Sequence, residues 1–343
     1  MADMYVRKKR MTEKMLDVAR AVNANPGVKK LIPYNFILNY SNRCNFQCPH
    51  CFAGASSSEP IDSKLTINDI KSLGNQADEL GIYEVDIQGG EPLLFPNLFE
   101  ILEALGTERF YTYITTNGWL MTQKLANKLA KAGVDRVSVS IDSFSAEEHD
   151  RFRMKEGSFD RAVKALEYIK NAGMKPFINV VIGHYNAQSD ELRVFCENML
   201  SKNYGIAFNC ATPTGNWHCN YDIMMTPDDT KCIEELRAKN KEIIRDLWNY
   251  FNISNQLNRG CPSVNLFYIN PFGDVLPCPY IQARIGNILE QPLKEILEYG
   301  FSFKELNTYS SKCSAGENFE FAKNYMSKET SIMNPIPVTA FFK

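Results

Sequence analysis

Three cysteines, Cys44, Cys48 and Cys51, follow one another at CxxxCxxC spacing directly after an apolar run that ends at Tyr40. Thiolates are soft ligands, and three of them on one short segment can hold a small inorganic centre. A [4Fe–4S] cube bound by only three thiolates keeps one iron open to a small-molecule ligand. Zinc is the competing interpretation, but zinc sites usually pair CxxC with a second pair, and none follows nearby. The spacing therefore favours an iron–sulfur cluster with an open site.

Length and charge limit the classes of protein to which the chain can belong. It has 343 residues, of which 44% are hydrophobic, and a formal net charge of −2. These values predict one large domain and a smaller one, and they give no electrostatic case for a nucleic-acid partner or an anionic membrane. No apolar run is long enough to span a bilayer. Ten cysteines without a signal peptide predict a cytoplasmic protein whose thiols serve metals or chemistry.

Short apolar strands alternate with helical patterns over residues 34–210. The expected strands are 36–40, 83–88, 110–115, 136–141, 177–182 and 206–209. The expected helices are near 66–80, 96–105, 122–132, 158–172 and 189–202. Six such units predict a parallel sheet, either curled into a barrel or open and doubly wound, and the pattern alone does not choose between them. Thr66 and Asp69 are expected to cap the first of the helices.

Polar and glycine-rich groups follow the second, third and fourth strands. They are Gly89-Gly90-Glu91-Pro92, then Thr115-Thr116-Asn117-Gly118, then Ser140 with Asp142. Each alone is more often a turn or a cap than a site. Their order behind the three cysteines predicts a ligand site, because reactive groups in parallel barrels gather at the C-terminal ends of the strands.

On these motifs, residues 34–210 resemble the radical S-adenosylmethionine (SAM) superfamily. The resemblance implies a partial (β/α)6 TIM-like barrel in which Cys44, Cys48 and Cys51 bind a [4Fe–4S] cluster and SAM occupies the open iron. It also implies that Gly89, Gly90 and Glu91 contact the methionine amino group of SAM. Asn117, Ser140 and Asp142 would lie near the ribose and methionine portions.

A segment from His149 to Asp160 resembles the part of this family that carries an arginine paired with the SAM carboxylate. Many relatives have glycine after that arginine, whereas Met154 stands here. The role is assigned to Arg153, with Arg151 as the alternative.

Beyond Cys210 the sequence becomes rich in polar residues, proline and glycine. Trp217 and His218 in this loop are candidate substrate contacts, and a helix is expected from Thr226 to about Tyr250. Two apolar runs joined by Pro271-Phe272-Gly273-Asp274 then predict a hairpin with a cysteine at each end, Cys261 and Cys278. A short helix near 292–299 leads on to Cys313.

This hairpin resembles the twitch domain, a shortened SPASM domain that binds an auxiliary cluster. The resemblance implies a second [4Fe–4S] cluster held by Cys261, Cys278 and Cys313. No CxxC partner follows Cys313, so the fourth position could be filled by Cys210, Cys219, Glu317 or substrate, or could stay open. The alternative is that these cysteines are buried small hydrophobes, as free cysteine often is.

We expect the chain to divide into an N-terminal amphipathic helix (1–33), the barrel (34–210), a linker loop and helix (211–254), the auxiliary-cluster domain (255–320) and a C-terminal tail (321–343). The basic run from Arg7 to Arg10 is expected to be a solvated helix end, and the tail to pack on the body. Cys210 ends the sixth strand at the reactive face, where it could donate a hydrogen atom, ligate iron or be a core thiol.

The predicted function is that of an enzyme that cleaves SAM reductively and abstracts hydrogen from a substrate. A reducing partner such as flavodoxin or ferredoxin is expected to supply the electron, and the auxiliary cluster to accept one or bind substrate. Because only some 33 residues precede the first strand, a small molecule such as a sugar or nucleotide is the expected substrate. The alternatives are a ribosomal-peptide maturase with a separate recognition protein, and a non-catalytic iron–sulfur protein for electron transfer.

Overall fold

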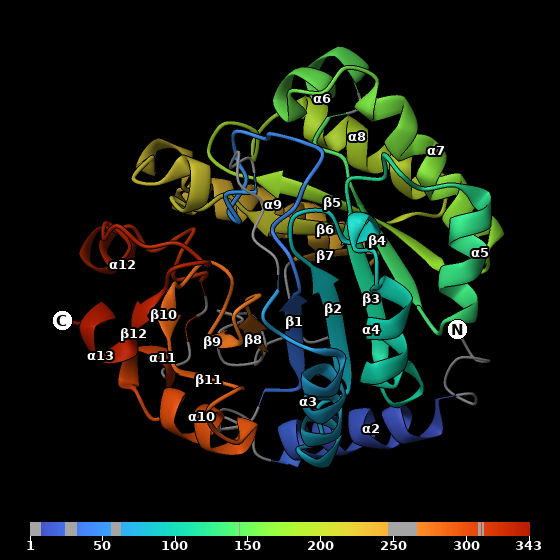
Figure 1. Ribbon diagram of the computed structural model, residues 1–343. Helices are drawn as coiled ribbons and strands as arrows, with labels where there is room; N and C mark the ends of the chain where they lie inside the picture. The colour runs from blue at the N-terminus through green and yellow to red at the C-terminus, as the bar shows by residue number, and fades with distance from the viewer. Residues whose placement is uncertain are drawn as a thin grey trace.

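A single curved sheet organises the molecule (Figure 1). The computed structural model describes residues 8–24, 33–55, 63–143, 145–245, 266–307, 310 and 312–343. Among these, a ten-stranded sheet runs in the order β11-β9-β8-β1-β2-β3-β4-β5-β6-β7. Its first seven strands are β1 (Asn35–Asn39), β2 (Glu84–Gln88), β3 (Tyr111–Thr116), β4 (Arg136–Ser140), β5 (Lys175–Ile182), β6 (Gly205–Cys210) and β7 (Ile243–Arg245).

Strands β1 to β7 are all parallel to their neighbours, and helices connect them. The crossover helices are α3 (Ile67–Glu79), α4 (Leu98–Leu105), α5 (Gln123–Lys131), α6 (Ala146–Arg153), α7 (Ser158–Asn171), α8 (Asp190–Ser201) and α9 (Pro227–Lys239). This is the expected partial barrel of the TIM type, and all six predicted strands are present. Helix α6 and strand β7 were not predicted.

The crossover helices begin where side chains can satisfy their free backbone N–H groups. Thr66 and Asp69 form the expected capping box at the start of α3, in which each side chain accepts from the other residue's backbone. The helix then places Ile70, Leu73 and Ala77 in the core beneath the sheet. Strand β1 is buried along its whole length, as expected for a strand covered on both faces.

Helix α2 (Lys9–Ala24) lies beneath the N-terminal ends of the barrel strands (Figure 1). The prediction of a solvated basic end is wrong for Lys8, which is buried. Its ammonium donates to the carbonyl oxygens of Phe110 at 2.8 Å and Gly133 at 2.7 Å, and it pairs with Asp135. These carbonyls precede β3 and β4, so Lys8 ties the helix to the base of the barrel.

Helix α9 ends at Lys239, about ten residues earlier than the sequence pattern suggested. Asn240 has extended backbone angles, and Ile243 and Ile244 then pair with β6 as the parallel strand β7. The β-branched pair is better suited to a sheet edge than to a helix.

The predicted hairpin is present as β8 (Leu266–Ile269) and β9 (Asp274–Leu276), joined by the expected turn. Strand β8 pairs in parallel with β1, so the hairpin extends the barrel sheet. Strand β11 (Gly286–Asn287) pairs with β9, while β10 (Ala283–Arg284) pairs with β12 (Ile336–Pro337). The remaining helices are α10 (Leu293–Gly300), α11 (Lys304–Asn307), α12 (Phe319–Tyr325) and α13 (Val338–Phe341).

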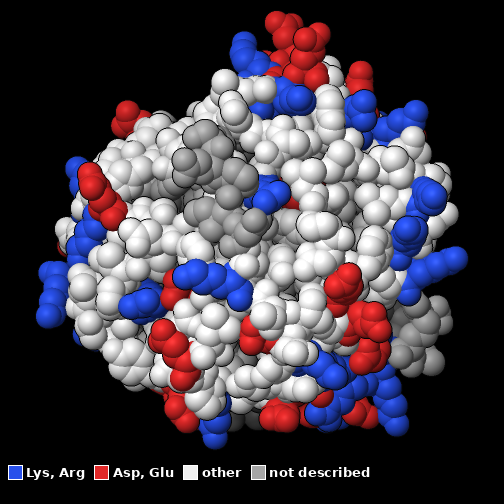
Figure 2. Space-filling view, viewed as in Figure 1, with Lys and Arg blue, Asp and Glu red and all other residues white. Residues whose placement is uncertain are grey.

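The C-terminal tail packs on the body as expected, with Val338 and Phe341 each 1% exposed. None of the described helices is both long enough and apolar enough to cross a bilayer. Figure 2 shows acidic and basic side chains interspersed on one face, where neither sign forms a continuous patch. The surface seen there agrees with the small net charge of the chain.

Candidate functional site

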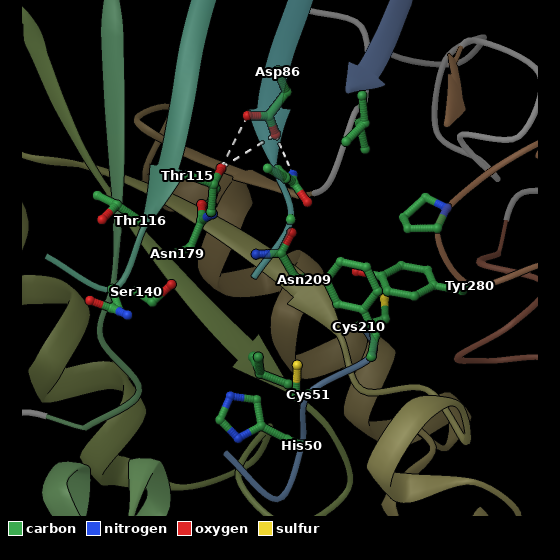
Figure 3. Close-up of a pocket in the computed structure, with 18 of the residues that line it drawn as sticks. His50, Cys51, Asp86, Thr115, Thr116, Ser140, Asn179, Asn209, Cys210 and Tyr280 are labelled. Carbon is green, nitrogen blue, oxygen red and sulfur yellow. Dashed lines mark hydrogen bonds between the residues drawn. The ribbon is translucent and has the colours of Figure 1, made fainter. Parts of the chain in front are cut away.

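A cavity of about 200 Å³ opens at the C-terminal ends of the barrel strands and continues into the barrel (Figure 3). Many of the predicted site residues line it: Cys44, Cys48, Cys51, Gly89, Gly90, Asn117, Ser140, Arg153, Cys210 and Cys278. The structure therefore brings residues from both predicted cluster sites and from the predicted SAM site to one cavity.

The first three cysteines lie on a segment that we call the cluster loop, residues 41–55. The Phe46 backbone N–H donates to Cys44 Sγ at 3.4 Å, and the Cys48 thiol lies 3.7 Å from the Arg153 carbonyl oxygen. Burial raises the pKa of the Cys44 thiol to about 12 and also raises that of Cys48. Binding iron would have to displace these protons.

The cluster loop fits a [4Fe–4S] group by its donor set: three soft sulfur ligands on one loop, lining one cavity. No three Cys, His, Asp or Glu side chains among the described residues are close enough to hold a single metal ion. A cube does not require such convergence, because each thiolate binds a different iron.

Backbone groups from two other segments hold the cluster loop. Gly90 N–H donates to the Ser41 carbonyl at 2.9 Å, and Glu91 N–H donates to the Arg43 carbonyl at 2.7 Å. From the loop after β6, the Asn216 side chain donates to the Cys48 carbonyl at 2.9 Å. The GGEP segment and the 211–218 loop thus both position the cluster loop.

The two glycines are needed for this contact. A Cβ added at Gly90 would lie 2.0 Å from the Arg43 carbonyl oxygen, and one at Gly89 would lie 2.5 Å from Asn39 Oδ1 and from the Ser41 carbonyl oxygen. Gly89 also has a φ of 139°, which side chains rarely allow. The close approach that requires glycine is therefore to the cluster loop.

Glu91 is fully buried and is not among the residues that line the cavity. Its carboxylate accepts from Thr116 Oγ1 at 2.6 Å, Asn117 N–H at 2.8 Å and Leu93 N–H at 3.0 Å. Burial raises its pKa in spite of these donors. The side chain fastens the GGEP turn to the end of β3, so its predicted effect on SAM would act through positioning.

Asn117 and Ser140, which are predicted to lie near SAM, both line the cavity. The Asn117 amide donates to Asn45 Oδ1 at 2.9 Å and its Oδ1 accepts from Trp119 N–H at 3.0 Å. Asn117 therefore links the end of β3 to the cluster loop.

Asp142 and Arg153 form a buried pair at the edge of the cavity. Arg153 donates to Asp142 Oδ2 through Nε at 2.8 Å and Nη2 at 2.7 Å, and Val181 N–H donates to the other oxygen at 3.0 Å. Although burial opposes the charged forms, each charge stabilises the other, so the pKa of Asp142 is lowered and that of Arg153 is raised. Arg153 lines the cavity, whereas Arg151 is exposed and does not.

Met154 follows Arg153 in a left-handed conformation, with φ 52° and ψ 38°, and caps α6. It is 61% exposed. Glycine adopts this conformation with less strain than other residues. The geometry explains why a helix that ends at this arginine would favour glycine at the next position.

His50 and Trp217 belong to an aromatic group beside the cluster loop. The His50 ring stacks on Phe152 with centroids 4.3 Å apart, and Trp217 lies 5.7 Å from His50 and 5.9 Å from Tyr185. Burial lowers the pKa of His50 to about 3, so its ring is neutral. Trp217 lines the cavity, whereas His218 is exposed and does not.

At the second predicted cluster site, Cys278 and Cys313 are buried, at 3% and 6% exposure. Cys278 Sγ accepts from Ile281 N–H at 3.3 Å and lines the cavity together with Cys210. Cys261 lies outside the described residues. Cys313 is not among the lining residues. The soft sulfur donors fit an iron–sulfur group by their chemistry.

Sequence reasoning missed a polar group inside the barrel, formed by Glu84, Asp86, Gln88, Tyr113 and Arg136, all of which line the cavity. Asp86 accepts from Thr115 Oγ1 at 3.3 Å and from the Gln88 amide (Figure 3). Burial raises the pKa of both Glu84 and Asp86 to about 7.

The available signal was the alternation of Glu84, Asp86 and Gln88 along β2. A parallel strand covered on both faces should read as a run of apolar residues. Polar residues at every second position instead indicate one face that borders an internal site.

Comparison with known families agrees with this geometry. The model of the Radical SAM superfamily matches residues 38–196, and the SPASM model, an iron-sulfur cluster-binding domain, matches residues 261–317. Among solved structures, Streptococcus suis SuiB bound to S-adenosylmethionine has a TM-score of 0.63 at 19% identity and covers 79% of this chain and 68% of its own. The anSMEcpe structure with bound AdoMet also has a TM-score of 0.63 at 19% identity, over 88% and 94% of the two chains.

Among curated proteins, an AdoMet-dependent heme synthase of Methanosarcina barkeri is 30% identical over 291 residues, 77% of this chain and 81% of that protein. The mycofactocin maturase MftC of Mycolicibacterium smegmatis is 28% identical, over 77% of this chain and 69% of its own length. The PqqA peptide cyclase of Granulibacter bethesdensis is 28% identical over 46% of this chain and 42% of that protein.

Proposed function

We propose that this chain, which belongs to the radical SAM superfamily and carries a C-terminal SPASM iron–sulfur cluster-binding domain, abstracts hydrogen from one side chain of a peptide. The observation that carries the proposal is the shared cavity, which Cys44, Cys48 and Cys51 line together with Cys210 and Cys278. A radical formed at one end of such a cavity and an electron acceptor at the other would permit a net two-electron oxidation.

Cys44, Cys48 and Cys51 would hold a [4Fe–4S] cluster, which would supply the electron for reductive cleavage of SAM to methionine and a 5′-deoxyadenosyl radical. The chain itself binds, orients and shields. Arg153, a buried cation at the cavity wall, would pair with the SAM carboxylate, while Asp142 holds its guanidinium in place. Gly89, Gly90, Asn117 and Ser140 would border SAM. Glu91 would hold the GGEP turn in place against the end of β3.

Relatives support a peptide substrate. Two of the similar proteins are named as a maturase and a peptide cyclase. The expectation of a small-molecule substrate is not supported by those names.

A small metabolite remains the second candidate because of one specific observation. The heme synthase from Methanosarcina barkeri is 30% identical, and the chain covers 81% of it.

The auxiliary site would accept the electron left on the substrate after hydrogen abstraction. Cys278 and Cys313, with Cys261, are the proposed ligands. A reducing partner such as flavodoxin or ferredoxin would supply the electron that starts each turnover.

The test is anaerobic reconstitution with iron and sulfide, reduction with dithionite, addition of SAM, and quantification of 5′-deoxyadenosine by mass spectrometry. Parallel reactions receive a pool of short peptides, a pool of porphyrin precursors, or buffer. We expect the peptide pool to increase 5′-deoxyadenosine and a peptide to lose two mass units. Stimulation by porphyrins alone would support the second candidate, and no 5′-deoxyadenosine from reducible protein would contradict the radical chemistry.

A further inference from the structure

We propose that Cys210, the last residue of β6, is the fourth ligand of the auxiliary iron–sulfur cluster. The barrel itself would then supply one of the thiolates of the C-terminal cluster. This assignment does not depend on the substrate or on SAM cleavage.

Cys210 lies beside Gly316, the position at which a CxxC pair would have its second cysteine. Cys313-Ser314-Ala315-Gly316 has the spacing of a CxxC pair, but glycine stands at the second position. The backbone turns back on itself here, because Glu317 N–H donates to the Cys313 carbonyl oxygen at 2.9 Å. A Cβ added at Gly316 would lie only 2.7 Å from the Cβ of Cys210. The side chain of Cys210 therefore begins within contact distance of the point where a side chain at position 316 would begin.

A buried hydrogen-bond network ties Cys210 to Cys313. Arg245 of β7, which is 1% exposed, donates through Nη2 to Cys210 Sγ at 3.1 Å and forms an ion pair with Glu317. Glu317 in turn accepts from the Cys313 backbone N–H at 2.7 Å. The two sulfur-bearing residues are thus held by one arginine–carboxylate pair.

The same network disfavours Glu317 as the fourth ligand. Besides the Arg245 guanidinium and the Cys313 N–H, its carboxylate accepts from Thr230 Oγ1 at 2.6 Å. Iron would have to displace these partners from a buried group, at a considerable cost in free energy. The sulfur of Cys210 accepts from Arg245, a hydrogen bond that a thiolate bound to iron can keep, and its thiol proton leaves for solvent.

Cys219 is disfavoured by its position. It is exposed, does not line the cavity, and lies in the turn near Tyr221 and Ser327. Cys210, in contrast, is 3% exposed and lines the cavity together with Cys278. A hydrogen bond from an arginine N–H to a ligand sulfur is also one of the means by which proteins set the reduction potential of a cluster.

The test uses the full chain with Cys44, Cys48 and Cys51 replaced by Ala, so that the auxiliary site holds the iron that remains. We expect this background to bind about four irons per chain after anaerobic reconstitution. Adding Cys210→Ala is expected to remove about one iron in four on mild oxidation and to give the EPR signal of a three-iron cluster. Adding Cys210→Ser should keep the iron but shift the EPR spectrum of the reduced cluster.

Cys196→Ala is the matched control, because Cys196 is equally buried but lies on α8 and does not line the cavity. It should change neither iron content nor spectrum. If Cys210→Ala fails to fold by circular dichroism, the serine variant decides, since its hydroxyl can still accept from Arg245. A spectrum identical to the background in Cys210→Ser, or no iron in the background itself, would overturn the assignment.

Discussion

The two cysteine sites of this molecule are built in opposite ways. Cys44, Cys48 and Cys51 lie within one loop, which backbone hydrogen bonds from Gly90, Glu91 and Asn216 hold in place. At the other site, Cys210, Cys278 and Cys313 come from distant segments, and the described contacts that link Cys210 to Cys313 run through the side chains of Arg245 and Glu317. The ligands of the first site are already close together in the sequence, whereas those of the second site come together only when the chain has folded.

The largest expected effect tests whether the two sites are independent. Replacing Cys44, Cys48 and Cys51 by Ala should reduce SAM cleavage to the level without enzyme while about half of the iron stays bound. The reason is that the proposed SAM-binding cluster would be lost but the auxiliary ligands would be intact. Iron analysis and the 5′-deoxyadenosine assay on the same sample measure both quantities. Complete loss of iron would show that the second site depends on the first.

The next prediction tests how the cluster loop is positioned. Gly90→Ala should lower the free energy of unfolding by about 3 kcal/mol and reduce iron binding at the first site, because its Cβ would collide with the Arg43 carbonyl oxygen. Urea denaturation and iron analysis provide the measurement.

Gly54→Ala is the control in the same loop. Among the described residues, nothing lies within 4 Å of a Cβ placed at Gly54, although its φ is +60°. Its expected cost is about 1 kcal/mol from backbone strain alone. Equal effects for the two variants would mean that the contact with Arg43 does not matter.

Much of the fold was predictable because its pattern is local and repeated. The six strands from β1 to β6 were found from short apolar runs between helical patterns. Helix α6 was missed because its sequence, AEEHDRFR, is almost entirely polar. Strand β7 was read as the end of a helix, since three residues are too few to show a period.

The two cysteine sites likewise differ in how far the sequence predicts them. Cys44, Cys48 and Cys51 were predicted to form a site from spacing, and they line one cavity. The neighbours of Cys210 could not be foreseen, because Arg245 and Gly316 reach it only through tertiary packing. The ligand roles of both sets remain predictions.

A third prediction concerns the barrel interior, where polar side chains from different strands meet. Burial raises the pKa of Asp86 to about 7, so the folded state favours the protonated carboxyl. That contribution to stability is complete below pH 4 and is lost as the pH rises through 7. Asp86→Asn cannot lose a proton at this position. As the pH rises from 5 to 8, the free energy of unfolding of the wild type should therefore fall by about 2 to 3 kcal/mol relative to that of the variant.

Urea denaturation of both proteins across this pH range is the measurement. Asp190→Asn is the control, because the Asp190 side chain is 93% exposed. Its curve should stay parallel to that of the wild type. A parallel curve for Asp86→Asn as well would show that Asp86 ionises normally.

The smallest expected effect lies beside Arg153. Met154→Gly should raise the free energy of unfolding by about 1 kcal/mol, because Met154 is held in a left-handed conformation. Met154→Ala removes the exposed side chain but keeps the strain, so it should bring no gain. Thermal unfolding of the three proteins compares them, and a gain with alanine would assign the effect to the side chain.

The pairing of β8 with β1 has a consequence for how the chain is made. Asn35 pairs with Leu266, about 230 residues later in the sequence. During synthesis, the edge of β1 that faces β8 therefore stays unpaired until most of the protein has left the ribosome. Exposed strand edges promote aggregation. A fragment that stops before β8 would keep this edge open permanently. The barrel sheet therefore becomes complete only once the C-terminal domain is present.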